Sequence, residues 1–264
     1  MWTEAKGKKK RIGDYRLRRV RAHLDSGKFE TEELPCTDVE DFLGGIARSF
    51  KQLGGYRVRE AYDPAAPLIM NLGNLSGTDA MTGLRVFFSA YSPLKVANNG
   101  MPLAMWSAAS GKFGTKLAAA GVDEMIFLGR APKPVYLVIR SEGGRPTCAL
   151  EDATHLLGKT THEKIVWLAE RYPDAHFCAV GPSGENWQTV RYAGIACSTV
   201  NQLRSKHNKP RFAGRGGMGG IMGSKNLLAL VAQAPDRKGG QLTPKLVEVN
   251  KEIARGEGSR NYRD

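Results

Sequence analysis

The chain has 264 residues, 41% of them hydrophobic, which is enough to bury one substantial core or two small ones. No apolar run approaches the roughly 18 residues that a membrane-spanning helix needs, and the first residues lack the apolar stretch of a secretory signal. We therefore expect a cytoplasmic protein that does not contact membranes. The formal net charge of +13 favours anionic partners, namely nucleic acid, a phosphorylated cofactor or an acidic protein surface.

The cysteines and histidines do not indicate a metal site. Four cysteines are widely scattered without a Cys-x-x-Cys pair, which favours ordinary reduced thiols over zinc or an iron–sulfur cluster: Cys36, Cys148, Cys178 and Cys197. His155 and His162 have no partner at metal-ligand spacing.

In chain order, residues 1–11 form a basic arm that we interpret as solvated. Alternating apolar residues on both sides of a turn at residues 25–28 predict an opening β-hairpin. Thr37 and Glu40 form a capping-box pattern, and the apolar spacing that follows predicts a helix ending at Gly54 and Gly55. Short apolar strands are predicted at residues 67–72 and 86–90, and a glycine-led helix start at residues 111–114 offers free amides to an anion.

Further along, residues 124–129 and 134–140 are predicted to be a strand pair joined by the turn at residues 130–133. A turn and a helix are expected within residues 153–172, and strands at residues 175–180 and 190–197. The largely apolar residues 226–232 are expected to be buried. Thr243 and Pro244 are predicted to start a last helix. Hairpin-like strands mixed with a few helices, without regular strand–helix alternation, favour an α+β fold.

One stretch organises the rest of the chain, the run from Lys209 to Lys225 with six glycines. No Asp or Glu occurs from Asn186 to Pro235, so the cations of the run are unopposed. Exposed amides beside unopposed cations favour binding of a phosphate or pyrophosphate. A flexible linker and a nucleic-acid-binding tail are the alternatives. Apolar residues follow the run directly, which favours an ordered loop, and its spacing does not fit a Walker A motif.

The segment Ala-Gly-Arg-Gly-Gly-Met-Gly-Gly-Ile-Met-Gly-Ser-Lys-Asn-Leu resembles the signature of the aldehyde:ferredoxin oxidoreductase family of tungsten-pterin enzymes. Other matching segments follow the family order: the loop at residues 73–85, Ser92-Pro-Leu, residues 110–121, and Gly181-Pro-Ser-Gly-Glu-Asn. The resemblance covers roughly residues 12–255. It implies a β-rich saddle of two structurally similar halves, with the pterin-binding domain at residues 12–235 and a C-terminal helix and polar tail at residues 236–264.

The resemblance also implies a cofactor site for tungsten or molybdenum held by two pterins. The residues that it assigns to cofactor binding are Arg85, Ser110, Gly111, Arg211, Phe212, Ala213, Gly214, Arg215, Gly216, Gly217 and Lys225. An asparagine of the family helps to hold a magnesium ion between the two pterin phosphates, but here Ala108 aligns with it. If the extra residues around positions 96–101 are aligned differently, Asn98 or Asn99 corresponds to the asparagine of the family.

Members of the family oxidise aldehydes or related carbonyls and pass electrons to an iron–sulfur protein. Their cluster-binding and catalytic groups lie in helical domains beyond this segment. The expectation is therefore a cofactor-binding subunit or domain that is inactive alone, whose [4Fe-4S] cluster lies on another domain or a second subunit and whose electron acceptor resembles ferredoxin. The sequence names no catalytic residue. The alternative function is a non-catalytic basic module that binds nucleic acid or nucleotide phosphates.

Overall fold

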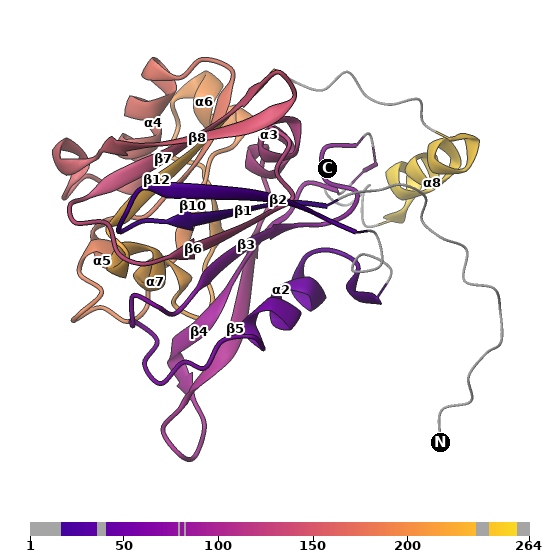
Figure 1. The fold of residues 1–264 in the computed structure, drawn as a ribbon. Coiled ribbons are helices and arrows are strands. Elements are labelled where there is room, and N and C mark those ends of the chain that lie inside the picture. The colour runs from indigo at the N-terminus through magenta and orange to yellow at the C-terminus, as the bar shows by residue number, and fades with distance from the viewer. Residues whose placement is uncertain (1–16, 36–40, 79, 82, 236–242, 258–264) are drawn as a thin grey trace, which may run out of the picture.

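The computed structural model describes residues 17–35, 41–78, 80–81, 83–235 and 243–257, which form two six-stranded mixed sheets around a shared hydrophobic core (Figure 1). The first half contains β1 (Leu17–His23), β2 (Lys28–Leu34), α2 (Ile46–Leu53), β3 (Leu68–Leu72), β4 (Val86–Val96), β5 (Pro102–Ala109), α3 (Phe113–Ala119) and β6 (Glu124–Leu128).

The second half contains β7 (Val135–Glu142), β8 (Arg145–Asp152), the 3-10 turn η1 (Thr154–Leu156), α4 (Thr161–Arg171), β9 (Ala175–Ala179), α5 (Pro182–Glu185), β10 (Ile195–Cys197), α6 (Val200–Ser205), β11 (Arg211–Ala213), α7 (Met218–Ser224) and β12 (Leu227–Gln233). Helix α8 (Pro244–Arg255) follows and has no buried residue. Among the described residues, no helix combines the length and apolarity needed to cross a bilayer.

The two halves repeat one topology. Their strand orders, β2-β1-β6-β3-β4-β5 and β8-β7-β12-β9-β10-β11, match position by position. In each half the last strand lies parallel to the first, as β6 pairs with β1 and β12 pairs with β7. Helices α3 and α7 occupy equivalent places before these last strands. The predicted α+β fold with two similar halves is therefore confirmed.

The strands predicted at residues 124–129 and 134–140 exist, but the prediction that they pair with each other is wrong. Strand β6 completes the first sheet between β1 and β3, whereas β7 begins the second sheet between β8 and β12. The segment at residues 130–133 connects the two halves. Its Ala131 N–H donates to the carbonyl of Lys225, 3.1 Å away, which leaves the connection bonded to α7 instead of closing a hairpin.

The helix predicted to end at Gly54 is shorter than its apolar spacing indicated. Thr37 and Glu40 lie outside the described residues, and α2 begins only at Ile46. Gly45 has a φ of +65° and donates its N–H to the carbonyl of Leu72, 2.8 Å away. A Cβ on Gly44 would lie 2.6 Å from the same carbonyl oxygen. The chain therefore turns at these glycines because it packs against the end of β3.

Strands β5, β8 and β11 were not predicted, β12 was expected only as buried apolar structure, and one further strand is shorter than expected. Strand β5 begins with a proline and is rich in alanine, while β8 has no fully buried residue, so neither shows strong strand periodicity. Both are edge strands that pair with one neighbour, β4 and β7 respectively. The strand predicted at residues 190–197 is shorter in the structure, where only β10 (Ile195–Cys197) forms.

A buried ionic network attaches α2 to the first sheet. Glu124 of β6 accepts hydrogen bonds from Arg48 of α2 (3.1 Å) and from Asn71 of β3 (2.7 Å), and it pairs with Arg19 of β1. The side chains of Arg48 and Glu124 have no exposed surface. Charges buried this deeply need their partners, so the network specifies where α2 packs.

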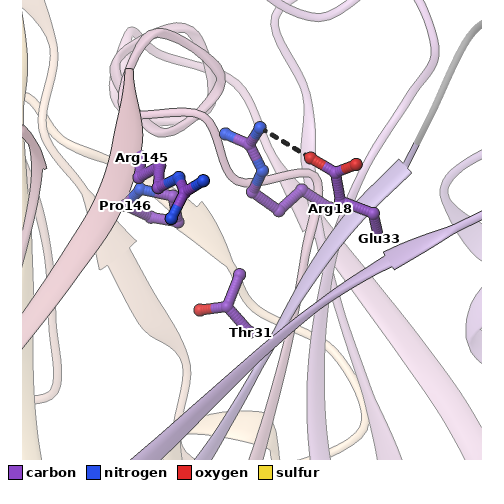
Figure 2. A pocket seen from close by; sticks show the side chains of 5 residues that line it. All are labelled: Arg18, Thr31, Glu33, Arg145 and Pro146. Carbon is purple, nitrogen blue, oxygen red and sulfur yellow. Dashed lines mark hydrogen bonds and ion pairs between the residues drawn. The ribbon is translucent and has the colours of Figure 1, made fainter. Parts of the chain in front are cut away.

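A contact between the two halves lies on the side of the molecule where β1 and β2 approach the β7–β8 turn. Arg18 of β1 donates to the carbonyl of Gly144 in the β7–β8 turn (3.0 Å) and pairs with Glu33 of β2 (3.0 Å). Figure 2 shows the hollow between this pair and Arg145 and Pro146 of β8, a cavity of about 370 Å³. This hollow lies at the β2 and β8 side of the molecule, whereas the glycine run lies at the β11 side.

Candidate cofactor-binding site

The glycine run folds as a strand, a loop and a helix. It begins with β11, turns through Gly216 and Gly217 with φ values of +66° and +72°, and enters α7 with Gly217 as the N-cap residue. Residues of L configuration rarely adopt such φ values, so these two positions require glycine for the turn itself. The run is therefore an ordered segment and not a linker.

The glycines within α7 serve helix packing. A Cβ on Gly219 would lie 2.4 Å from the carbonyl oxygen of Gly194, and one on Gly220 would lie 3.1 Å from the hydroxyl of Tyr62. The Gly219 N–H donates to the carbonyl of Ala193, 2.9 Å away. The first turn of α7 is therefore buried, and this amide is used inside the protein instead of facing a ligand.

The accessible part of the run lies within residues 211–215, where Ala213 is buried and its neighbours reach the surface. Arg211, Phe212 and Arg215 are exposed, and Gly214 is half-buried. A Cβ on Gly214 would meet only the Cβ of Phe212, at 3.8 Å, so the space beside this backbone is open. No hydrogen bond from the Gly214 N–H is found within the described residues. A ligand can therefore approach the main chain closely here.

The equivalent loop of the first half, between β5 and α3, lies next to this segment. Gly111 has a φ of +118°, and a Cβ there would lie 2.7 Å from the carbonyl oxygen of Ser198, which follows β10. Arg85 is exposed and directly precedes β4, whose first residue Val86 pairs with Ala109. Arg85 therefore lies beside Ser110 at the open end of the β4–β5 hairpin, opposite its turn. The structure brings these residues and β11 to the same side of the molecule.

Lys225 occupies a different environment from the rest of the predicted site. Its side chain is buried, and its ammonium donates to the carbonyls of Pro64 (3.0 Å) and Gly129 (3.2 Å). Burial, helped by the nearby Arg130 charge, lowers the pKa of Lys225 to about 8. The Lys225 side chain therefore ties α7 to two loops, behind the exposed face of the run.

The residues considered for magnesium do not lie together. Asn98 and Asn99 are in the turn of the β4–β5 hairpin, which projects from the sheets in Figure 1. Ala108 pairs with Phe87 near the opposite end of the same hairpin. Among the described residues, no group of three or more His, Cys, Asp or Glu could hold a metal ion. Ala108 itself offers no side-chain ligand to a magnesium ion.

Three residues that contact the loop were not expected from the sequence: Ser92, Ser107 and Tyr192. Each makes a side-chain hydrogen bond to the backbone between Gly214 and Gly216. Ser92 lies in the Ser92-Pro-Leu segment that matches the family, but a serine inside a strand and a tyrosine in a loop carry no local pattern that indicates such a contact. Only the packing of the two halves against each other places them here.

Comparison with known proteins shows the family to which the chain belongs. Residues 19–234 match the family described as "Aldehyde ferredoxin oxidoreductase, N-terminal domain". The chain belongs to the aldehyde ferredoxin oxidoreductase family. The resemblance inferred from the glycine run is thus confirmed over most of the chain.

The part of the chain that matches relatives in the aldehyde ferredoxin oxidoreductase family covers about a third of their length. A tungsten-containing aldehyde ferredoxin oxidoreductase of Pyrococcus abyssi is 36% identical over 228 residues, which is 83% of this chain and 33% of the relative. The WOR-like subunit of an aliphatic sulfonate oxidoreductase of Pyrococcus furiosus is 30% identical over 231 residues, which is 80% of the chain and 33% of that protein.

A solved structure has the same fold. The active site complex BamBC of benzoyl coenzyme A reductase, determined with 1,5-dienoyl-CoA, superimposes with a TM-score of 0.71 at 30% sequence identity. The match covers 84% of this chain and 32% of the matched chain. The chain therefore corresponds to the N-terminal third of the relatives that it matches.

Proposed function

We propose that the chain binds the pterin cofactor of a tungsten or molybdenum oxidoreductase that oxidises aldehydes or related carbonyls and passes electrons to an iron–sulfur protein. One observation carries the proposal. The two topologically equivalent strand-to-helix loops, residues 110–112 and 214–217, lie on one side of the molecule. A cofactor with two pterins presents two phosphates, and a repeated fold offers one loop to each. The tungsten content of the relatives supports the same cofactor class.

The residues at the two loops fit an anionic group. Arg85 and Arg215 are exposed and form no ion pair with the described residues. Each charge-assisted contact to a phosphate contributes about 1.5–3 kcal/mol. Gly214 leaves open space where a phosphate or pterin can approach the backbone. The acid-free stretch from Asn186 to Pro235 adds no repulsion. The site therefore favours a negatively charged group, through direct contacts with the two arginines and through the positive electrostatic potential of the acid-free stretch.

When bound, the cofactor supplies the redox centre. The residues of this chain bind and orient it: arginines neutralise the phosphates, and the glycine backbone allows a close approach. If a magnesium ion accompanies the phosphates, Ala108 would not contribute a side-chain ligand to it. The groups that act on the substrate are not assigned to this chain.

A further polypeptide segment, on the same chain or a second subunit, is proposed to cover this side of the molecule and to carry the [4Fe-4S] cluster. The chain spans a third of its relatives' length. Large apolar side chains near the loops are exposed: Leu84, Trp106, Tyr192 and Phe212. Exposed apolar surface of this kind marks interfaces. Electrons would leave to a ferredoxin-like protein through that cluster.

The test is analysis of protein purified without oxygen together with its native partner. We expect tungsten or molybdenum by mass spectrometry of the metal, and a pterin by fluorescence after oxidation. An intact, folded complex that contains neither metal nor pterin would reject the proposal. Steeply salt-dependent binding of RNA by such a complex would then support a basic nucleic-acid-binding module.

A further inference from the structure

Three side chains hold the backbone of the glycine loop at three successive residues. The Tyr192 hydroxyl donates to the carbonyl of Gly214 at 2.6 Å. The Arg215 N–H donates to the Ser107 hydroxyl oxygen at 3.0 Å. The Ser92 hydroxyl donates to the carbonyl of Gly216 at 2.9 Å. We call these three residues, Tyr192, Ser107 and Ser92, the loop clamp.

The first two bonds act on one peptide plane. The carbonyl of Gly214 and the N–H of Arg215 belong to the same peptide unit, and they point in opposite directions because the unit is trans. Tyr192 holds one edge of this unit and Ser107 holds the other. A flip of the peptide would break both bonds. The orientation of this unit is therefore defined by two side chains.

The third bond holds the peptide unit between Gly216 and Gly217. Ser92 Oγ accepts from the Leu94 N–H at 3.0 Å, which leaves its single proton for the Gly216 carbonyl. Ser92 has no exposed surface, so water does not compete for this bond. The peptide unit between Arg215 and Gly216 thus lies between two units whose orientation is set.

The clamp joins the two halves of the fold. Ser92 and Ser107 belong to β4 and β5 of the first sheet, whereas Tyr192 and the loop belong to the second half. A loop with glycine at positions 214, 216 and 217 has a large conformational entropy when it is not held. Hydrogen bonds from rigid strands reduce the entropy that a ligand must remove on binding.

We propose that Tyr192, Ser107 and Ser92 are positioning residues that pre-order the Gly214–Gly216 backbone for the cofactor phosphate. This inference rests on the proposed function for its ligand, but the ordering itself belongs to the chain without ligand. The clamp residues do not bind the cofactor. They act through the loop, which presents Arg215 and the open side of Gly214.

The experiment compares Tyr192→Phe, Ser107→Ala and Ser92→Ala with the wild-type full chain. Tyr192 is 63% exposed, so its variant loses the hydroxyl with little change in packing. Tyr91→Phe is the matched control, because the Tyr91 hydroxyl also donates to backbone carbonyls, those of Leu53 (3.1 Å) and Tyr56 (3.0 Å), away from the loop. Amide hydrogen exchange over residues 211–218 and calorimetric titration with inorganic pyrophosphate are the two readouts.

We expect faster exchange in residues 211–218 for the clamp variants, and pyrophosphate affinity weaker by roughly two- to tenfold for each lost hydrogen bond. Tyr91→Phe should leave both readouts at the wild-type values. Unchanged exchange in Tyr192→Phe and Ser107→Ala, or faster exchange with unchanged affinity, would overturn the inference. Wild-type protein that binds no pyrophosphate and retains no pterin would reject the proposed function, while the exchange data would still decide whether the clamp orders the loop.

Discussion

Gly223 of α7 and Gly184 of α5 are in direct contact: a Cβ on Gly223 would lie 1.9 Å from the carbonyl oxygen of Gly184. The obstacle is backbone, so a rotamer change cannot relieve it. The glycine signature of this family therefore combines two physical requirements, close packing of α7 and an open approach at Gly214.

Replacing Gly223 with alanine should destabilise the protein severely. Overpacking in a core costs about 1–3 kcal/mol, and more where backbone must move. We expect a loss at or above the upper end of that range, measured by urea unfolding. Gly54→Ala is a control, because its Cβ meets the nearest atom at an ordinary 3.4 Å. Equal stability of Gly223→Ala and wild type would contradict the packing described for α7.

Replacing Gly214 with alanine should separate ligand approach from folding. Gly214 is not among the glycines with positive φ, and an added Cβ meets nothing closer than 3.8 Å. We therefore expect stability within about 1 kcal/mol of wild type, the usual scale of Gly-to-Ala exchanges at compatible sites. The added methyl group occupies the open space beside the backbone, so cofactor retention should fall. Metal and pterin content of the purified complex is the measurement; full occupancy would place the ligand elsewhere.

Arg85→Ala and Arg215→Ala should lower cofactor retention and leave the fold intact, since both side chains are exposed. Loss of one charge-assisted contact corresponds to about 1.5–3 kcal/mol, or roughly a 10- to 150-fold weaker interaction. Arg145→Ala is the matched control, an exposed arginine at the hollow of Figure 2 on the β8 side. The site would be wrong if both variants kept wild-type metal and pterin content.

Glu124→Gln should weaken folding by about 3–5 kcal/mol, because it leaves the buried guanidinium groups of Arg19 and Arg48 without their shared carboxylate. Glu170→Gln is the control. It removes an ion pair with Lys206 whose side chains are 61% and 70% exposed, and such pairs contribute about 0–1 kcal/mol. The free energy of unfolding of both variants, measured with denaturant, tests this prediction. A loss below 1 kcal/mol for Glu124→Gln would mean that the network does not hold α2.

Lys225 should make stability depend on pH above neutrality. Its pKa of about 8 in the folded protein lies below the usual value of 10.5, so between these pH values the unfolded chain binds more protons. The contribution of Lys225 to the free energy of unfolding therefore rises with pH, by at most about 1.4 kcal/mol per pH unit. We expect Lys225→Met to show a smaller increase, or a steeper decrease, between pH 8 and 10 than wild type. Identical slopes would contradict the burial of a charged Lys225.

Much of the fold was predictable from local signals. The capped start of α8 at Thr243 and Pro244, the fully buried strand β3 and the start of α3 follow from capping chemistry and apolar runs. Strands β5 and β8 were not predictable, because edge strands with small or polar residues lack periodicity and form only where a neighbouring strand offers its backbone. The place where α2 begins was also decided by packing, at Gly44 and Gly45.

For the candidate site, the sequence alone determined the glycine run, its cations and the family, because residue type and spacing carry that information directly. Only the tertiary structure decided which glycines are buried against backbone and which are open to solvent. It buried Gly219 and Gly223 against other backbone, exposed Gly214 and Arg215, and withdrew Lys225 behind α7. It also brought Ser92 and Ser107 to the loop from strands more than a hundred residues earlier in the chain. Hydrogen bonds between segments that are far apart in the chain depend on how the two sheets pack together. No local sequence pattern indicates which distant residues will meet.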